Sequence, residues 1–212
     1  MAQAGPGRLP TFEDVKAAAG RIAGHAVRTP LLAQTLLDAR TGGRILLKCE
    51  TLQHTGSFKF RGAYNRLAQL DEDGRRAGVV AFSSGNHAQG VAAAARLLGI
   101  PATIVMPSDA PRVKMRNTLA LGARVVEYER GRESREEIAA RIAREEGGVL
   151  VPSFDDPDVI AGQGTVGLEI VEQATGLGLA LDEVVVCTSG GGLVAGAALA
   201  IAALSPGTRT WC

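Results

Sequence analysis

Short apolar runs alternate with amphipathic segments along most of this chain. A short apolar run between turn residues is typical of a buried strand, and apolar residues at helical spacing are typical of a helix. Strands are predicted at 44–49, 79–82, 102–106, 124–128, 149–152, 184–187 and 208–211. Helices are predicted at 12–23, 31–39, 87–98, 112–121, 135–146, 159–174 and 193–204. Strands and helices that alternate in this way build a parallel sheet with helices on its faces, so the predicted fold class is α/β.

The composition adds an excess of glycine, with 27 glycines in 212 residues, where average proteins contain about 7%. Glycine permits tight turns and close backbone approaches, which are common where loops surround a ligand. Apolar residues make up 46% of the chain, enough for a packed core, and the net charge is only +1. This balance argues against a nucleic-acid partner or a membrane surface.

The cysteines and histidines form neither a disulfide pattern nor a metal pattern. Cys49, Cys187 and Cys212 are far apart and include no Cys-x-x-Cys pair, which favours a reducing compartment. His25 and His54 have no ligand partners at metal spacing, so no metal site is expected. The stretch 1–10 lacks the basic start and apolar run of a signal peptide, and no apolar run reaches the roughly 20 residues of a membrane span. We therefore expect a cytoplasmic protein.

The first candidate for chemistry is the segment 57–63, Ser-Phe-Lys-Phe-Arg-Gly-Ala. Lys59 stands between two phenylalanines where a loop is expected to become a helix. Apolar neighbours and the positive end of a helix both disfavour the ammonium form, so the pKa of Lys59 should fall. A neutral amine is the form that attacks a carbonyl group to give an imine. On this segment alone, the alternative is a structural lysine whose stem packs on the rings while its amine reaches water.

A second candidate is the segment 83–90, Ser-Ser-Gly-Asn-His-Ala-Gln-Gly, between a predicted strand and a predicted helix. Small hydroxyls, glycine and asparagine there present N–H groups and polar side chains at the positive end of the helix. Such a loop suits a carboxylate. The alternative is a plain helix cap followed by a His87 that only lines the helix.

A third candidate is the segment 189–193, Ser-Gly-Gly-Gly-Leu, again between a predicted strand and a predicted helix. Three glycines let the backbone wrap around an anion, and the helix dipole favours negative charge, which predicts a phosphate site. The segment is not a Walker loop, because no Gly-Lys-Ser/Thr follows. The alternative is a tight turn without a ligand.

Gly162, Gly164 and Gly167 match the Gly-x-Gly-x-x-Gly pattern of dinucleotide-binding proteins. That pattern requires a strand directly before it, and here 155–158 intervene. We therefore interpret these glycines as helix-packing positions.

Taken together and in this order, the three candidate segments resemble the fold-type II pyridoxal-phosphate enzymes, specifically the serine/threonine dehydratase (threonine ammonia-lyase) and serine racemase group. The resemblance extends from Thr11 to Cys212 and includes 159–165, Val-Ile-Ala-Gly-Gln-Gly-Thr. It implies a fold similar to the tryptophan synthase β chain, with two α/β domains around the cofactor. The larger domain would comprise 1–63 and 148–212 and be incomplete at its C-terminus, and the smaller would comprise 64–147.

The resemblance also implies roles for the candidate residues. Lys59 would hold pyridoxal 5′-phosphate as an imine and then take the proton from the substrate Cα. Asn86 would bond to the 3′-hydroxyl of the cofactor, and Phe58 would pack near its ring. The cofactor phosphate would lie against Ser189, Gly190, Gly191, Gly192 and Leu193. The substrate carboxylate would be surrounded, mostly through loop N–H groups, by Ser83, Ser84, Asn86 and His87. Ser84 also matches the second acid/base of the racemases.

The activity that the resemblance implies is a β-elimination, the dehydration and deamination of L-threonine or L-serine to a 2-oxo acid and ammonia. The sequence Lys59-Phe60-Arg61 favours the dehydratase group, because cysteine and threonine synthases usually have Lys-Asp-Arg at that place. The loop sequence Ser-Ser-Gly-Asn-His also favours the dehydratase group, because cysteine synthases have Thr-Ser-Gly-Asn-Thr there. The alternatives are a serine racemase, a dehydratase of hydroxyaspartate or phenylserine, and a non-catalytic fragment or partner subunit.

Members of this group continue well beyond the position of Cys212. We therefore expect that the chain is truncated at its C-terminus and that, made alone, it is a poor catalyst. The missing part would supply the residue facing the pyridine nitrogen and the acidic metal ligands of some members. The full-length protein is expected to be a homodimer.

Overall fold

The computed structural model describes residues 8–212. The expectation that 1–10 is not a signal peptide concerns mostly residues outside this range. In chain order the elements, with η for short 3₁₀ helices, are α1 (Phe12–Ile22), β1 (Leu31–Ala33), α2 (Thr35–Thr41), β2 (Leu46–Lys48), η1 (Glu50–Leu52), η2 (His54–Gly56), α3 (Lys59–Ala68), α4 (Glu72–Ala77), β3 (Val79–Phe82), α5 (Asn86–Leu98), β4 (Ala102–Pro107), α6 (Arg112–Ala120), β5 (Arg124–Tyr128), α7 (Arg135–Glu146), β6 (Val149–Leu150), α8 (Pro157–Gly176), β7 (Glu183–Val185), α9 (Gly192–Leu204) and β8 (Arg209–Trp211).

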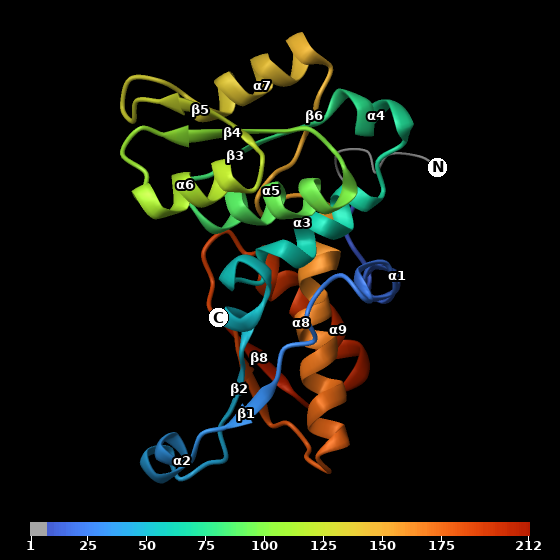
Figure 1. The fold of residues 1–212 in the computed structure, drawn as a ribbon. Helices are drawn as coiled ribbons and strands as arrows, with labels where there is room; N and C mark the ends of the chain where they lie inside the picture. Colours follow the sequence, from blue (N-terminus) through green and yellow to red (C-terminus); the bar gives the residue numbers. More distant parts are fainter. Residues whose placement is uncertain (1–7) are drawn as a thin grey trace.

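A four-stranded parallel sheet forms one end of the molecule (Figure 1). Its strands follow the order β5-β4-β3-β6, and Val79 of β3 lies opposite both Ala102 of β4 and Val149 of β6. The short strands predicted from apolar runs therefore meet side by side, although they are separated in sequence by helices. The predicted α/β class with a parallel sheet is confirmed.

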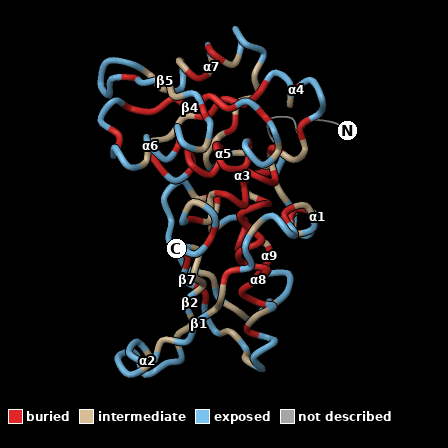
Figure 2. The backbone as a smooth tube through the Cα atoms, in the orientation of Figure 1, coloured by how far each residue is buried: buried red, intermediate tan, exposed pale blue. Residues whose placement is uncertain are grey.

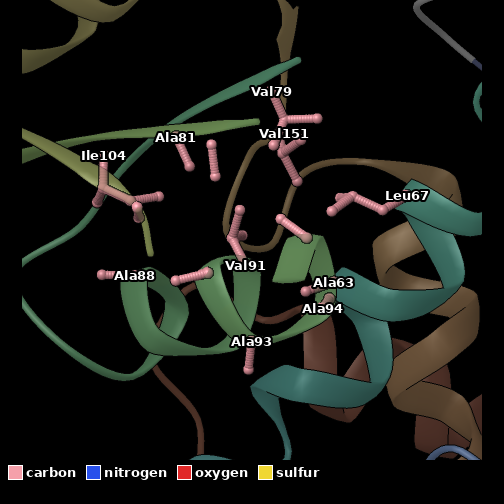
Figure 3. Packing of buried hydrophobic residues seen from close by; sticks show 14 of the residues in the cluster. Ala63, Leu67, Val79, Ala81, Ala88, Val91, Ala93, Ala94, Ile104 and Val151 are labelled. Carbon is pink, nitrogen blue, oxygen red and sulfur yellow. The ribbon is translucent and has the colours of Figure 1, made fainter. Parts of the chain in front are cut away.

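Both faces of this sheet are covered, because successive side chains of a strand point to opposite faces. On one face Val79, Ala81 and Ile104 pack in a cluster with residues of α3 and α5 (Figure 3). On the other face Val80 packs with Ile142 of α7. The sheet is thus held between α7 and the α3–α5 pair.

The other end of the molecule is built around α8, which packs against α1, α3 and α9 (Figure 1). Beside it lie a two-stranded parallel pair, β7 and β8, and a two-stranded antiparallel pair, β1 and β2. Figure 2 shows that burial is concentrated along α3, α5 and α8, whereas α2 and the outer loops are exposed. No helix in the described part of the chain is both long and apolar enough to cross a membrane.

The proposed division into 64–147 and two flanking segments stays a prediction. The parallel sheet extends slightly past that boundary, because β6 begins at Val149 and pairs with β3. Helix α3 also lies between the two ends of the molecule, since it packs on α5 on one side and on α8 on the other.

The predicted helix at 31–39 is confirmed only from Thr35 onward, and its first part is wrong. Leu31–Ala33 forms β1 and pairs with β2, and α2 begins only at Thr35. The antiparallel ladder gives the backbone of this segment its hydrogen bonds, and this tertiary pairing overrides the helical preference of its leucines. Helix α4 was not predicted, because Gly74 in its middle weakens a short helical pattern, although Asp71 caps its N-terminus.

The glycines of α8 permit close helix packing, which confirms their interpretation as packing positions. A Cβ added at Gly162 would lie 2.7 Å from the carbonyl oxygen of Arg61 in α3. A Cβ added at Gly164 would lie 2.7 Å from the carbonyl oxygen of Gly196 in α9. Since real Cβ atoms do not approach so closely, α3, α8 and α9 can pack in this way only with glycine at these points.

Gly164→Ala is expected to lower the free energy of unfolding by about 3 kcal/mol, because its methyl group would overlap with the α9 backbone. Gly176→Ala is the matched control, since it lies at the end of the same helix with nothing within 4 Å of the added Cβ. The control should change the free energy of unfolding by less than about 1 kcal/mol. Urea unfolding followed by circular dichroism measures both, and two equally small effects would contradict the close packing of α8 on α9.

Candidate active site

The three candidate segments meet at one cavity of about 510 Å³. The cavity lies where α3, α5 and α9 begin and where β3 ends. Its lining includes every residue predicted for the site, namely Phe58, Lys59, Ser83, Ser84, Asn86, His87, Ser189, Gly190, Gly191, Gly192 and Leu193. Because a helix N-terminus carries partial positive charge, three such ends at one cavity favour an anionic ligand.

Lys59 is the first residue of α3, and its side chain lines this cavity. Its Nζ donates a hydrogen bond of 2.6 Å to the main-chain oxygen of Ser153 and lies 5.2 Å from the ring centroid of Phe58. Burial lowers the pKa of Lys59 below the ordinary lysine value, as the sequence predicted. The neutral, nucleophilic form of the amine is therefore easier to reach.

The start of α3 is held in place by the residues around Lys59. Arg61 is completely buried and forms ion pairs with Glu50 and Glu169, at 2.8 and 2.7 Å. On another side, a Cβ added at Gly90 would lie 3.0 Å from the carbonyl carbon of Lys59, so α5 approaches α3 closely at this point. These contacts hold the backbone of Lys59 in place at the edge of the cavity.

The loop after β3 is folded so that its polar groups face the cavity. The Gly85 N–H donates to Oγ of Ser83 at 3.1 Å, which closes a tight turn, and α5 begins at Asn86. Lys114 reaches across from α6, and its Nζ donates to Oδ1 of Asn86 at 3.2 Å. A Cβ added at Gly85 would lie 2.8 Å from Nζ of Lys114, so the glycine makes room for this amine.

His87 is neutral and presents an acceptor. Its Nε2 lies 3.0 Å from the main-chain oxygen of Val151, and since a carbonyl oxygen only accepts, Nε2 carries the hydrogen. Burial, together with a smaller effect from the nearby charge of Lys59, lowers the pKa of His87 to about 4. Nδ1 is buried and has no partner within residues 8–212. The ring therefore has no hydrogen to offer a carboxylate, which leaves that task to the N–H groups of the loop.

The glycine loop 189–192 leads directly into α9. Gly191 has a φ of 89°, in the left-handed region that strongly favours glycine. Gly192 permits a close approach, because an added Cβ would lie 2.9 Å from the main-chain oxygen of Phe154. The loop therefore presents backbone rather than side chains at the N-terminus of α9, as a phosphate site requires.

Sequence reasoning missed several residues of the cavity lining, including Lys114, Arg135, Ser153 and Phe154. Two signals could have found them. Lys114 and Arg135 are cations in the first turns of α6 and α7, where the helix dipole disfavours positive charge, so another role is indicated. Ser153 and Phe154 follow β6, and the carboxyl ends of parallel strands are where ligands bind in α/β sheets.

The residues of this cavity fit pyridoxal phosphate. A buried lysine with a lowered pKa suits its aldehyde, and a glycine loop at a helix N-terminus suits its phosphate. Nδ1 of His87, which lines the cavity, is a buried polar atom without a partner in the described chain, and such atoms are typical of functional sites. Among residues 8–212, no cluster of His, Cys, Asp and Glu could hold a metal ion.

His87 gives the folded protein a predictable response to acid. Its folded-state pKa of about 4 lies below the unfolded value of 6.5, so the folded state binds fewer protons between these two pH values. Its contribution to stability is therefore complete above pH 6.5 and is lost as pH falls toward 4, by roughly 3 kcal/mol. Urea unfolding of wild type and His87→Gln from pH 7.5 to 4 gives the free energy of unfolding of each protein at each pH. The difference between the two free energies should shrink on acidification, and a constant difference would contradict a buried neutral imidazole.

The comparisons with known proteins agree with this geometry. Residues 22–212 match the family model described as pyridoxal-phosphate dependent enzyme. The L-threo-3-hydroxyaspartate ammonia-lyase of a Pseudomonas species is 55% identical over 94% of this chain and 61% of its own length. The L-threonine ammonia-lyase of Thermotoga maritima is 50% identical over 92% of this chain and 48% of its own length. The solved structure of maize serine racemase superposes with a TM-score of 0.91 and 41% identity, and covers 96% of this chain and 60% of that one.

The chain thus spans about three fifths or less of the length of these relatives. The relatives include ammonia-lyases and racemases, and the family match covers most of the chain. Because the family model matches residues 22–212, we conclude that this chain belongs to the family of pyridoxal-phosphate dependent enzymes.

Proposed function

We propose that the protein is a pyridoxal-phosphate-dependent ammonia-lyase that eliminates water and ammonia from a 3-hydroxy amino acid, with 3-hydroxyaspartate as the preferred substrate. The observation that carries this preference is the pair of cations, Lys114 and Arg135, in the lining of the cavity that holds Lys59. A substrate with one carboxylate is served by the loop after β3 alone. This pair of cationic groups beside the loop suits a second carboxylate.

Lys59 carries the chemistry in this proposal. Its Nζ would hold the cofactor covalently, and the same amine would take the proton from the substrate Cα. The bound cofactor supplies an electron sink that stabilises negative charge at Cα. Burial lowers the pKa of Lys59, so that its amine can be neutral and accept a proton. The backbone of Lys59 is held at the start of α3, which positions the amine for that transfer.

The remaining residues position the ligands. The substrate α-carboxylate binds to the N–H groups of the loop formed by Ser83, Ser84, Asn86 and His87, at the N-terminus of α5. Phe58 would pack near the cofactor ring, and Asn86 would hydrogen-bond to its 3′-hydroxyl. The glycine loop from Ser189 to Leu193, which lines the same cavity, would hold the cofactor phosphate.

Arg135 is placed to bind the second carboxylate of the substrate. It lines the main cavity and also a neighbouring cavity of about 360 Å³ that shares Ser83 and Ser84. Its guanidinium is stacked 5.3 Å from the ring centroid of Phe82 and pairs with Glu136 at 2.7 Å. Both members of that ion pair are largely exposed, so the pair is weak and a substrate carboxylate can replace Glu136.

The relatives support this proposal and also keep its alternative open. The 55% identical Pseudomonas protein is named for L-threo-3-hydroxyaspartate, which supports a dicarboxylic substrate. The 50% identical Thermotoga protein is named for L-threonine, so L-threonine or L-serine remains the second candidate substrate. The two candidates differ at Arg135, because only 3-hydroxyaspartate has a second carboxylate for this residue to bind.

Lys59 is expected to be the residue that binds the cofactor covalently. Reduction of the whole protein with borohydride in the presence of pyridoxal phosphate should fix the cofactor to Lys59, as peptide mapping by mass spectrometry would show. Lys59→Ala should lower turnover by roughly a thousandfold or more, because it removes both the anchor and the base. Lys16→Ala, an exposed lysine on α1, is the control. Label on Lys48 or Lys114 instead would contradict the assignment.

Arg135→Gln is expected to lower kcat/KM for 3-hydroxyaspartate by about 100-fold, the effect of losing one charge-assisted bond to a carboxylate in the transition state. For L-serine and L-threonine the change should stay within about threefold. Arg132→Gln removes the same charge from the exposed loop before α7, where Arg132 pairs with Glu129, and should alter neither. The release of 2-oxo acid from each substrate measures the effect. An equal loss for all three substrates would contradict a second-carboxylate site at Arg135.

Racemisation is a second candidate activity, supported by the place of Ser84. Ser84 lines the same cavity as Lys59, and a racemase needs an acid/base on each side of Cα. Ser84→Ala should then abolish racemisation while it spares most of the elimination, as chiral chromatography and 2-oxo acid release would show. If both activities fall equally, Ser84 only shapes the loop.

A further inference from the structure

The segment that follows β6 touches all three motifs of the site, although it belongs to none of them. The main-chain oxygen of Val151 accepts from His87, and that of Ser153 accepts from Lys59. Phe154 lies against the glycine loop, in contact with Gly190 and Gly192. A single short stretch of chain thus connects the lysine, the substrate loop and the predicted phosphate loop.

The contact between Phe154 and the glycine loop is tight on two sides. A Cβ added at Gly190 would overlap with Cγ and Cδ1 of the Phe154 ring. A Cβ added at Gly192 would lie 2.9 Å from the main-chain oxygen and 3.0 Å from Cα of Phe154. Of the three glycines, only Gly191 has a positive φ, so Gly190 and Gly192 are explained by Phe154 rather than by backbone conformation.

Phe154 can act as a support because both ends of its segment are anchored. Before it, the Val151 N–H donates to the main-chain oxygen of Val80 at 2.8 Å, which ties the segment to β3. After it, Asp156 caps α8 by accepting from two backbone N–H groups and also accepts from Nε of Arg66 at 3.1 Å. Phe154 as a residue is 43% exposed, so the fold does not require it as part of a closed core.

We propose that Phe154 is a positioning residue that holds the 189–192 loop in its phosphate-binding shape, with Gly190 present to admit its ring. This inference rests on the proposed function, because it takes the loop as the binder of the cofactor phosphate. Phe154 acts on the phosphate only through the loop. Its effect should therefore depend on the phosphate group of the ligand and on the residue at position 190.

The test compares pyridoxal phosphate with pyridoxal, which lacks the phosphate, by equilibrium dialysis against the whole protein freed of cofactor. Phe154→Ala should weaken pyridoxal phosphate binding by about tenfold and change pyridoxal binding by less than about twofold. Phe154→Leu, which keeps apolar bulk against the loop, should retain most of the affinity and serves if the alanine variant fails to fold. Phe12→Ala removes another half-buried ring, on α1, and should affect neither ligand.

A double variant provides the decisive comparison. Gly190→Ala alone should weaken pyridoxal phosphate binding by about tenfold, because its methyl group and the Phe154 ring compete for one space. In Gly190→Ala/Phe154→Ala that conflict is gone, so the double variant should bind no more weakly than Phe154→Ala. If the two losses simply add, or if pyridoxal binding falls as much as pyridoxal phosphate binding, the inference is wrong.

The outcomes also separate this inference from the proposed function. If the wild-type protein binds pyridoxal phosphate no more tightly than pyridoxal, the loop is not a phosphate site, and both proposals are overturned. If the wild type strongly prefers pyridoxal phosphate and the Phe154 variants keep that preference, the phosphate site stands and the role of Phe154 is refuted.

Discussion

The burial of one guanidinium, that of Arg61, is the interaction on which the position of Lys59 depends. Arg61 is fully buried on the first turn of α3, and its Nε and Nη2 donate to Glu50 while Nη1 and Nη2 donate to Glu169. Lys48 also donates to Glu169, so two cations share two carboxylates. A buried charge that loses its partner costs roughly 3–5 kcal/mol, so the arrangement tolerates little movement. The pairing raises the pKa of Arg61 and lowers that of Glu169, which keeps both groups charged.

This network determines where the cavity forms, because its members come from separate parts of the chain. Glu50 lies in η1 and Glu169 in α8, so Arg61 ties α3 to both. Glycines then let the neighbouring helices close in, with Gly162 against the Arg61 carbonyl and Gly90 against the carbonyl carbon of Lys59. As a result α3, α5 and α9 all direct their N-termini at the same space. The positive helix ends and the buried amine follow from this packing.

The sequence predicted most of the sheet and the three motifs, because these depend on local pattern. The apolar run 79–82 and the glycines at 190–192 are recognised from the residues directly beside them in the sequence. The features that the sequence did not predict depend on contacts between distant segments. Leu31–Ala33 is a strand only because β2 lies beside it, and Phe154 joins the site only because β6 aligns with β3. Arg135 and Lys114 are far from Lys59 in the sequence, and only the fold brings them to the same cavity.

In the proposed function, the Lys59 amine and the 189–192 loop bind the two ends of one cofactor across a single cavity. A crystal structure of the whole protein with pyridoxal phosphate tests it most directly. We expect electron density continuous with Nζ of Lys59 and a phosphate group surrounded by the N–H groups at the start of α9. A phosphate bound elsewhere, for example near Gly162–Gly167, or a cofactor attached to another lysine, would contradict it.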